Sequence, residues 1–482
     1  MPQRSATPYD NLVDEGSFER ARDDLTSTDP LSFQGYRDSL EAARSSSGSD
    51  ESVHAGRATI GDHEVEVAAF DFSFLGGSMG EVAGERVARA MERAAERNTP
   101  FILRAATGGA RMQEGMRSLI QMPKLVAARK TLAEARVPYI AVLGDPTTGG
   151  VLASVGALAD VTIAEHGATI GFAGPRVVAA FTGTEPSMAS HTSASALANG
   201  MVDMIVETEG VRGAIAALLD VLAPDSPMVG AAPAATTASS VDAWDAVEAA
   251  RAASRPTGPG LVHEMSDAYV EIHGDRAGTD DRALFAALAR VHGRRVVLLA
   301  LDRSVAPGPG AFRKARRCVR IADRLRLPLV TLVDTPGADP SETSEAGGIA
   351  WEIAGLFDDM LTADVPVVSI VTGEGGSGGA LAFAIADVLL AFEDAIFSVI
   401  GPEAAAAILW RDKERAPDAA RALKLGAADL VDLGIADGML AAPVSATSIA
   451  DAVAYHLDRM TDGPQDRGAA RRNRWRNLGG NR

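Results

Sequence analysis

Two stretches of the sequence repeat one pattern. VPYIAVLGDPTTGGVLASVGALADVTIAEHGATIGFAGP occupies residues 137–175, and VPVVSIVTGEGGSGGALAFAIADVLLAFEDAIFSVIGP occupies residues 365–402. In each stretch, an apolar run that opens with Val-Pro leads into a Gly-rich turn, a small-residue helical segment, a second strand and a terminal Gly-Pro. An ordered repeat of this length indicates two copies of one supersecondary unit in a single chain.

Strand and helix patterns alternate around both repeats, from about residue 58 to 222 and again from about 261 to 456. This order predicts an α/β protein in which each half is built from repeated ββα units. The Pro-, Ala- and Ser-rich stretch between the halves is typical of a linker. We expect an N-terminal helical segment at 1–55, domains at 56–223 and 241–460, a linker at 224–240, and a basic disordered tail at 461–482.

Composition excludes several functions. The formal net charge of −18 argues against nucleic acid as a partner, because phosphate binding needs clustered cations. Cys318 is the single cysteine, which excludes an internal disulfide and a cysteine-based zinc ribbon, so we expect no zinc. The sequence shows neither a secretory signal nor an apolar run long enough to cross a bilayer. We therefore expect a cytoplasmic protein without a membrane partner.

The Gly-Gly pairs of the repeats, Gly149-Gly150 and Gly378-Gly379, are the first candidates for chemistry. A glycine pair between a buried strand and a helix lets a ligand approach the backbone closely, and the first N–H groups of the helix have no internal acceptor. Such N–H groups hold an anion or a developing oxyanion. Glycines that merely permit close packing are the alternative, but two pairs in matching places favour two oxyanion holes.

A further glycine turn, TGGARMQEG at 107–115, has DTPGADP at 334–340 as its counterpart. Arg111 is placed to meet a phosphate or a carboxylate, although a salt bridge within the protein is the plainer interpretation. The DTPG element also resembles a GTPase switch. The sequence lacks the Gly-Lys-Ser/Thr of a phosphate-binding loop, which argues against that activity.

The sequence also argues against several common kinds of catalytic site. We predict no Gly-x-Ser-x-Gly nucleophile elbow and no His-Glu-x-x-His zinc motif. The histidines are scattered without a metal-ligand spacing, and His166 is expected in a turn between two short strands. The predicted chemistry therefore depends on backbone donors, with proton transfer left to substrate or cofactor.

Both halves of the sequence resemble a known family. The first half is similar to the β subunit of the bacterial acetyl-CoA carboxylase carboxyltransferase in FDFSFLGGSMG, TGGARMQEG, DPTTGGVLAS and IGFAGPRVV. The second half is similar to the α subunit in IHGDRAGTDDRALFAALARVHGRRV, LVDTPGADP, GEGGSGGALAFAIAD and FSVIGPEAAAAILW. The resemblance covers most of the chain, in the order β then α.

The resemblance implies a crotonase-like fold in each half and transfer of CO₂ from carboxybiotin to acetyl-CoA, which gives malonyl-CoA for fatty acid synthesis. It implies an ATP-dependent complex with a biotin carboxyl carrier protein and a biotin carboxylase, and a homodimer or larger homo-oligomer. The sequence has no biotinyl Met-Lys-Met segment, so carboxybiotin is expected on a separate carrier.

The resemblance also implies site residues. The first hole would hold the thioester enolate oxygen at Gly149 and Gly150, and the second the ureido oxygen of biotin at Gly378 and Gly379. CoA is expected near Gly108, Gly109, Ala110, Arg111, Gly171, Phe172, Ala173 and Gly174.

The chain departs from the family pattern in three places. It lacks the zinc ribbon, it is shorter and less aromatic after IGFAGPRVV, and its basic stretch is reduced to DRSVAPGPGAFRKARR, where Arg313, Lys314, Arg316 and Arg317 remain. Two alternatives stay open: a decarboxylase such as the βγ unit of malonate decarboxylase, and a non-catalytic scaffold subunit that keeps the fold. The intact glycine pairs argue against the scaffold.

Overall fold

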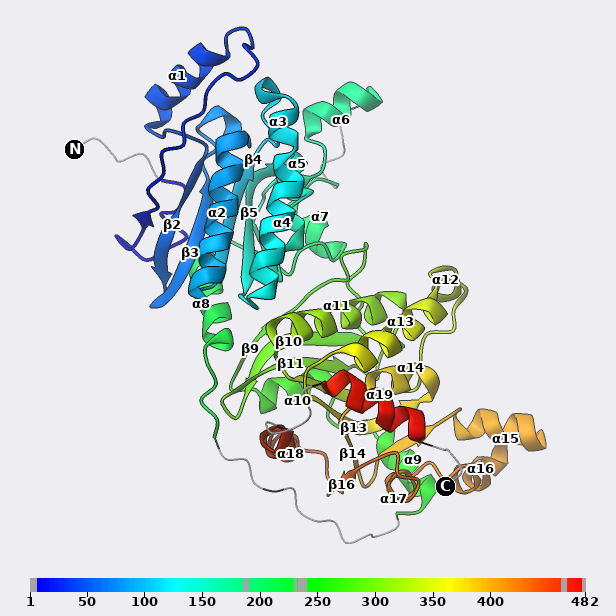
Figure 1. Cartoon of the computed structure of the whole chain (residues 1–482). Coiled ribbons are helices and arrows are strands. Elements are labelled where there is room, and N and C mark those ends of the chain that lie inside the picture. The colour runs from blue at the N-terminus through cyan, green and yellow to red at the C-terminus, as the bar shows by residue number, and fades with distance from the viewer. Residues whose placement is uncertain (1–6, 185–189, 229–231, 233–240, 461–465, 479–482) are drawn as a thin grey trace. The chain divides into compact units, whose positions relative to one another are not determined.

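A computed structural model describes residues 7–184, 190–228, 232, 241–460 and 466–478 (Figure 1). The contacts divide the chain into two compact units, Met1–Asp220 with Arg276–Gly278, and Val221–Asp275 with Thr279–Arg482. Each unit is a largely parallel sheet with helices on its faces, so the predicted α/β fold with one repeat in each half is confirmed.

The sheet of the first unit follows the order β1-β2-β3-β4-β5-β6-β8, and β7 pairs with the end of β5 off this path. The β2–β3 hairpin is antiparallel, and the pairs from β3 to β6 and from β6 to β8 are parallel. The strands are β1 (Glu19–Arg20), β2 (Val53–Ile60), β3 (His63–Phe70), β4 (Phe101–Thr107), β5 (Tyr139–Thr148), β6 (Val161–Glu165), β7 (Ile170–Gly171) and β8 (Met204–Val206). The helices are α1 (Tyr36–Ser47), α2 (Glu81–Arg97), α3 (Met116–Leu119), α4 (Gln121–Glu134), α5 (Gly149–Leu152), α6 (Pro175–Thr182), α7 (Ser193–Ala198) and α8 (Val211–Leu222).

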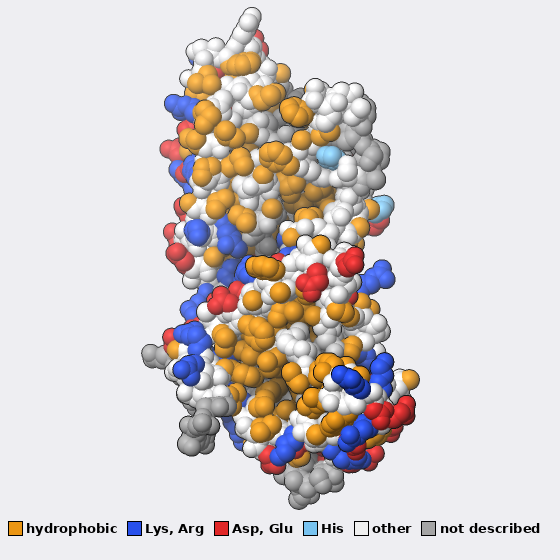
Figure 2. All heavy atoms as spheres, turned by 90° about the vertical axis from the view of Figure 1, so that its right-hand side faces the viewer, with side chains coloured by type: hydrophobic (Ala, Val, Ile, Leu, Met, Phe, Trp, Pro, Cys, Tyr) orange, Lys and Arg blue, Asp and Glu red, His pale blue; other side chains and the backbone are white. Residues whose placement is uncertain are grey.

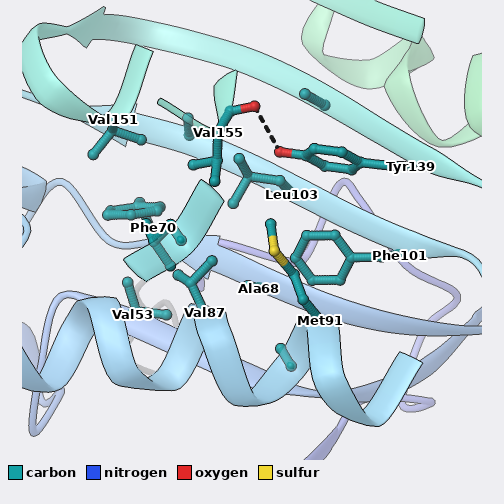
Figure 3. Packing of buried hydrophobic residues seen from close by; sticks show 14 of the residues in the cluster. Val53, Ala68, Phe70, Val87, Met91, Phe101, Leu103, Tyr139, Val151 and Val155 are labelled. Atoms are coloured by element: carbon teal, nitrogen blue, oxygen red, sulfur yellow. Dashed lines mark hydrogen bonds between the residues drawn. The ribbon is translucent and has the colours of Figure 1, made fainter. Parts of the chain in front are cut away.

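The core of the first unit lies between α2 and the sheet. Figure 3 shows Val87 and Met91 of α2 pointing toward the sheet, where Met91 lies beside Phe101. Apolar residues of α2 recur at helical spacing, which turns one continuous stripe toward the sheet. The Tyr139 hydroxyl is buried in this core and donates a hydrogen bond to the Val155 carbonyl at 2.9 Å, so its burial leaves no unpaired polar group.

The second unit repeats this topology with the sheet order β16-β14-β13-β12-β11-β10-β9, and β15 pairs with the end of β13. The helices α11 and α13 pack together in it as α2 and α4 do in the first unit. The strands are β9 (Ala268–Glu271), β10 (Leu284–Val291), β11 (Arg294–Leu301), β12 (Leu329–Thr335), β13 (Val367–Gly376), β14 (Val388–Phe392), β15 (Ile396–Ser398) and β16 (Gly438–Leu440). The helices are α9 (Ala243–Ala250), α10 (Gly258–Met265), α11 (Pro309–Leu325), α12 (Glu342–Ala346), α13 (Ile349–Thr362), α14 (Ser377–Phe383), α15 (Pro402–Trp410), α16 (Ala416–Ala422), α17 (Ala427–Asp432), α18 (Ala446–Met460) and α19 (Arg467–Asn477).

The N-terminal segment is less helical than its sequence suggests. Among the described residues before Ser52, α1 is the single α-helix, and β1 adds a short strand to the edge of the first sheet. Leu12, Tyr36 and Leu40 are buried, so this segment packs as part of the first unit. Asp, Ser and Pro residues at 23–30 favour turns over helix and explain the difference.

The predicted disordered tail is wrong for residues 466–478, because α19 packs on the second unit. Arg471 of α19 is buried and binds both carboxylate oxygens of Asp387, at 3.0 and 2.7 Å. Its remaining donors reach the carbonyls of Met360, Ala363 and Val365. Basic composition alone indicated solvation, whereas these acceptors satisfy the charge inside the fold.

Part of the expected linker is ordered on the second unit. The N–H groups of Ser226 and Met228 donate to the carbonyls of Gly293 and His292, both at 3.0 Å. Most of the rest of 224–240 lies outside the described residues. No helix among the described residues is long and apolar enough to cross a membrane.

Candidate functional site

The first Gly turn joins β5 to α5. Gly149 has φ 65°, a conformation that favours glycine, and its N–H donates to the Phe172 carbonyl at 2.9 Å. The N–H of Gly150, one residue on, has no acceptor among the residues that the structure describes. The turn therefore presents one free backbone donor at the end of the strand.

The loop after β4 approaches this turn closely. A β-carbon on Gly109, whose φ is 108°, would lie 3.3 Å from Gly149 Cα and 3.6 Å from the Gly150 nitrogen. The Gly109 N–H is bound by the Thr107 hydroxyl at 3.0 Å, whereas the N–H of Ala110 has no acceptor within the described part of the chain. Ala110 and Gly150 thus supply the open donors of the first turn.

Most predicted CoA-binding residues of the first half gather around this turn. Gly171 pairs with Thr148 in register, and the Phe172 carbonyl binds Gly149. A β-carbon on Gly174 would lie 3.9 Å from the Thr148 hydroxyl. The structure therefore brings residues 108–110, 149–150 and 171–174 together at one end of β5.

The second Gly turn joins β13 to α14 and meets the loop after β12. The Gly337 N–H is bound by the Thr335 hydroxyl at 3.2 Å, which repeats the Thr107–Gly109 contact of the first unit. A β-carbon on Gly379 would lie 2.8 Å from the Ala338 nitrogen, whereas one on Gly378 would meet nothing within 4 Å. The N–H groups of Ala338, Gly378 and Gly379 have no acceptor among the described residues.

Strand pairing shows that the two Gly-Gly pairs are not equivalent. Thr107 pairs with Thr147, and Thr335 pairs with Gly375. Counting two residues on from Thr147 and Gly375 makes Gly149 equivalent to Ser377, which has φ 59° at the start of α14. An alignment that matches Gly149-Gly150 with Gly378-Gly379 is therefore wrong by one residue. In the structure, Gly150 corresponds to Gly378.

This position also corrects the prediction that no nucleophile elbow is present. Residues 375–379 read Gly-Gly-Ser-Gly-Gly, which fits Gly-x-Ser-x-Gly, and Ser377 is exposed on a strand-to-helix turn with positive φ. A non-glycine residue in this conformation stores local strain. Among the described residues, no other side chain forms a hydrogen bond with the Ser377 hydroxyl, so the turn has the backbone of an elbow without a base bonded to its serine.

The prediction that Arg111 meets a ligand is also corrected. Its side chain is 0% exposed, and its guanidinium binds Glu51, Glu114 and the Ser78 carbonyl inside the first unit. Burial alone would raise the pKa of Glu51, but the hydrogen bonds from Arg111 hold that pKa below its ordinary value. Arg111 supports the Gly turn from within and meets the protein's own carboxylates.

Two residues beside the turns were not among the predicted site residues. The His191 ring lies against Gly171, where a β-carbon would be 2.5 Å from its Cδ2 atom. Asp334 is buried at the end of β12, and its Oδ1 accepts the Glu374 N–H at 3.0 Å. Neither stands in a recognisable motif, although Asp334 opens the DTPG element that the sequence singled out.

The helices at both turns are short. The α5 helix has 4 residues and α14 has 7. A macrodipole needs several aligned turns, so its contribution here is small. The site depends on individual N–H groups held in place by neighbouring loops.

Comparison with known proteins identifies the chain. Residues 231–462 match the family described as acetyl co-enzyme A carboxylase carboxyltransferase-like. The acetyl-coenzyme A carboxylase carboxyl transferase subunits beta/alpha of Salinispora arenicola (strain CNS-205) are 42% identical, over 98% of this chain and 90% of that protein. The chain belongs to the acetyl-CoA carboxylase carboxyltransferase family.

Two further similarities show how broad this family is. A probable biotin-dependent acyl-coenzyme A carboxylase beta3 subunit of Mycobacterium tuberculosis (strain CDC 1551 / Oshkosh) is 37% identical, over 88% of this chain and 86% of that one. The crystal structure of transcarboxylase 12S with hydrolysed methylmalonyl-coenzyme A aligns with a TM-score of 0.77 and 25% identity, over 94% of this chain and 88% of that one. The protein is thus a biotin-dependent acyl-CoA carboxyltransferase.

The basic residues that remain in the second half of this carboxyltransferase are used internally. Arg313 binds Asp275 at 2.8 Å, and Lys314, which is buried, binds Asp280 at 2.8 Å. Arg316 and Arg317 bond in the same way to carboxylates and backbone carbonyls. These cations fix α11 to the loop before β10 and to α13, so they are not free to bind a phosphate.

Large apolar side chains are exposed near the first turn of the carboxyltransferase. Figure 2 shows hydrophobic side chains gathered on one face of this unit. Met112 is 84% exposed and Phe172 is 72% exposed, and Met116, Val177 and Phe181 are also largely in solvent. An exposed apolar area of this kind marks a site of interaction with a ligand or a protein.

Proposed function

We propose that the protein transfers CO₂ from carboxybiotin, carried on a separate protein, to acetyl-CoA and so forms malonyl-CoA for fatty acid synthesis. The choice of acetyl-CoA is supported by the names of the relatives that are 42% and 41% identical to this chain. The observation that carries the proposal is the pair of strand-end turns with open backbone N–H groups, one in each unit.

The first turn is assigned to the acyl-CoA. The N–H groups of Ala110 and Gly150 would bind the thioester oxygen and stabilise the negative charge that develops there when the neighbouring carbon loses a proton. Gly108, Gly109, Gly171, Ala173 and Gly174 would line the acyl-CoA site beside these donors. Phe172 would cover the apolar part of the substrate, whereas Arg111 acts only by supporting the turn.

The second turn is assigned to the biotin end of the reaction. The N–H groups of Ala338, Gly378 and Gly379 have no acceptor among the described residues, and no atom from beyond the turn comes within 4 Å of a β-carbon on Gly378, so an anionic oxygen fits there. Carboxybiotin supplies both the carboxyl group and, after its loss, the base. The turn's own part is to hold the urea oxygen in place.

The proposed partners are a biotin carboxyl carrier protein and an ATP-dependent biotin carboxylase, acting in the cytoplasm. A homodimer or larger homo-oligomer is proposed because exposed apolar residues occur in both units, including Phe181 at 91% and Trp351 at 79%. Size-exclusion chromatography with light scattering tests the assembly, and a monomer at micromolar concentration would contradict it.

Substrate choice needs its own test, because one similar crystal structure contains methylmalonyl-coenzyme A. The purified protein is mixed with biocytin and either malonyl-CoA or methylmalonyl-CoA, and release of acetyl-CoA or propionyl-CoA is followed. We expect faster decarboxylation of malonyl-CoA, dependent on biocytin. Equal or faster use of methylmalonyl-CoA would contradict the acetyl preference, and turnover of malonyl-CoA without biocytin would point to a decarboxylase.

A single substitution tests the assignment of the second turn. Gly378→Ala adds one methyl group where the protein leaves room, so the fold should tolerate it while the bound oxygen is displaced. Loss of one oxyanion contact typically lowers kcat by about 10²–10³. Unchanged carboxyl transfer in a folded Gly378→Ala variant would contradict the assignment of the second turn.

A further inference from the structure

The buried carboxylate of Asp334 lies at the base of the second turn. Its residue is 1% exposed, and its Oδ1 accepts the N–H of Glu374, three residues before Ser377. A β-carbon on Gly373 would collide with this carboxylate, so the end of β13 can pass close to Asp334 only with glycine at this position. Asp334 therefore contacts the backbone that leads directly into the turn.

The other oxygen of Asp334 faces an arginine without bonding to it. Asp334 Oδ2 is 3.7 Å from Nη1 of Arg303, and neither atom has a hydrogen-bond partner among the described residues. Arg303 is itself held, because its Nη2 donates to the Arg255 carbonyl at 2.6 Å. Two buried polar atoms left unpaired are costly, so their retention beside a functional turn points to a use.

The other charged groups around Asp334 are already paired. Arg255 binds both oxygens of Asp394, each at 2.9 Å. Glu374 turns its carboxylate away to Arg251, at 2.8 and 2.7 Å. Arg303 is therefore the cation that faces Asp334, and burial raises the pKa of Asp334 to about 6 against the attraction of Arg303 and Arg255.

The first turn has no such group. Thr107 and Thr335 occupy equivalent places, so the residue equivalent to Asp334 is Ala106. A charge under one turn and a methyl group under the other shows that the fold itself does not require the carboxylate. The difference separates the biotin turn from the acyl-CoA turn.

We propose that ionised Asp334, which faces Arg303, is a positioning residue that sets the backbone of residues 374–379 for the second oxyanion site. The inference rests on the proposed function of that turn. When Asp334 is protonated, its attraction for Arg303 is lost and its bond to the Glu374 N–H weakens, so the open donors of the turn lose their alignment. Carboxyl transfer should then fall as the pH is lowered through the pKa of Asp334.

The test compares the intact enzyme with Asp334→Asn, Arg303→Lys and a control, Asp437→Asn. Asp437 also accepts a strand N–H, that of Leu389 at 2.7 Å, but at a strand outside the turn. In the wild type, kcat should fall below about pH 6 while KM for the acyl-CoA stays constant. Asp334→Asn should lower kcat at pH 8 by about tenfold to a hundredfold, and its kcat should not fall further at low pH as that of the wild type does.

Arg303→Lys keeps the cation and should preserve more activity than Asp334→Asn. Thermal unfolding at pH 8 separates positioning from bulk stability. Asn resembles the neutral acid that burial favours, so Asp334→Asn should unfold at the same temperature as the wild type or higher. A purely structural role would lower the unfolding temperature together with kcat.

Hydrogen exchange of the Glu374 amide gives a readout that needs no activity. After correction for intrinsic exchange rates, its protection should drop about tenfold between pH 7.5 and 5.5 in the wild type, and should be low at both pH values in Asp334→Asn. Wild-type kcat in Asp334→Asn, a further fall of its kcat at low pH, or pH-independent protection would each overturn the inference. A wild type without carboxyl transfer would instead refute the proposed function, and the exchange data would still decide the role of Asp334.

Discussion

The α-carbon of Gly379 lies against the backbone of Ala338, so that a β-carbon there would be 2.8 Å from the Ala338 nitrogen. A β-carbon on Gly378, one residue earlier, would have no atom from beyond its own turn within 4 Å. One glycine thus lets two loops touch, and the other leaves space beside open N–H groups. The missing side chain thus serves loop packing at Gly379 and ligand access at Gly378.

Alanine at these two positions should have different effects on stability. Gly379→Ala displaces the Ala338 loop and should lower both the unfolding temperature and kcat. Gly378→Ala should leave the unfolding temperature unchanged or raised, since alanine favours helix over glycine by about 1 kcal/mol, while kcat still falls. Differential scanning calorimetry and the biocytin assay measure the two effects. Equal loss of stability in both variants would contradict this account.

Arg111→Ala should destabilise the first unit by about 3–5 kcal/mol, because it leaves the buried carboxylates of Glu51 and Glu114 without their cation. Denaturant unfolding measures the change. Arg117→Ala is the matched control: that residue is 52% exposed in its pair with Glu81, and the pair is worth less than about 1 kcal/mol. A small effect of Arg111→Ala would mean that the buried network is not formed in solution.

Gly171→Ala should cost about 1–3 kcal/mol by overpacking, because the new methyl group meets the His191 ring. His191→Ala alone should change stability little, since that side chain is partly exposed. Combining the two should recover most of the loss, and a double-mutant cycle gives the coupling. Additive effects would show that the ring does not occupy this place.

The C-terminal helix should be required for the stability of the second unit. Arg471→Ala removes five donors from Asp387 and three carbonyls and should lower the free energy of unfolding by about 3–5 kcal/mol. Arg472→Ala, which loses one exposed contact with the Leu361 carbonyl, should have little effect. Similar unfolding curves for the two variants would show that α19 is not held as described.

His273 should make the free energy of unfolding fall at alkaline pH. Hydrogen bonds to Asp280 and then Glu271 raise its pKa to about 9 from 6.5. The stabilisation is fully present below pH 6.5 and is lost as the pH rises through about 9. Its size is on the order of 2 kcal/mol, seen as a fall in the free energy of unfolding between pH 7 and 10. In His273→Gln this fall should disappear, and its persistence would assign the dependence to another group.

The sequence was sufficient for the fold because apolar periodicity and Gly turns act over short distances. The strand ends at Thr148 and Gly376 follow from an apolar run that meets glycines. The sequence could not align the two turns, because Ser377 takes the positive φ that glycine takes at Gly149. Ser377 and Gly149 differ in side chain, so the sequence does not show that they are equivalent, whereas the strand register does.

The sequence by itself determined the repeated α/β architecture, the family and the places where two strands end in open backbone. Only the tertiary structure decided which charges are buried and with whom they pair. Arg111, Arg471 and Asp334 lie in stretches that suggest exposed ligand-binding or tail residues, yet each is enclosed by segments far away in the chain. Burial and ion pairing are set by those distant contacts, which no local pattern contains.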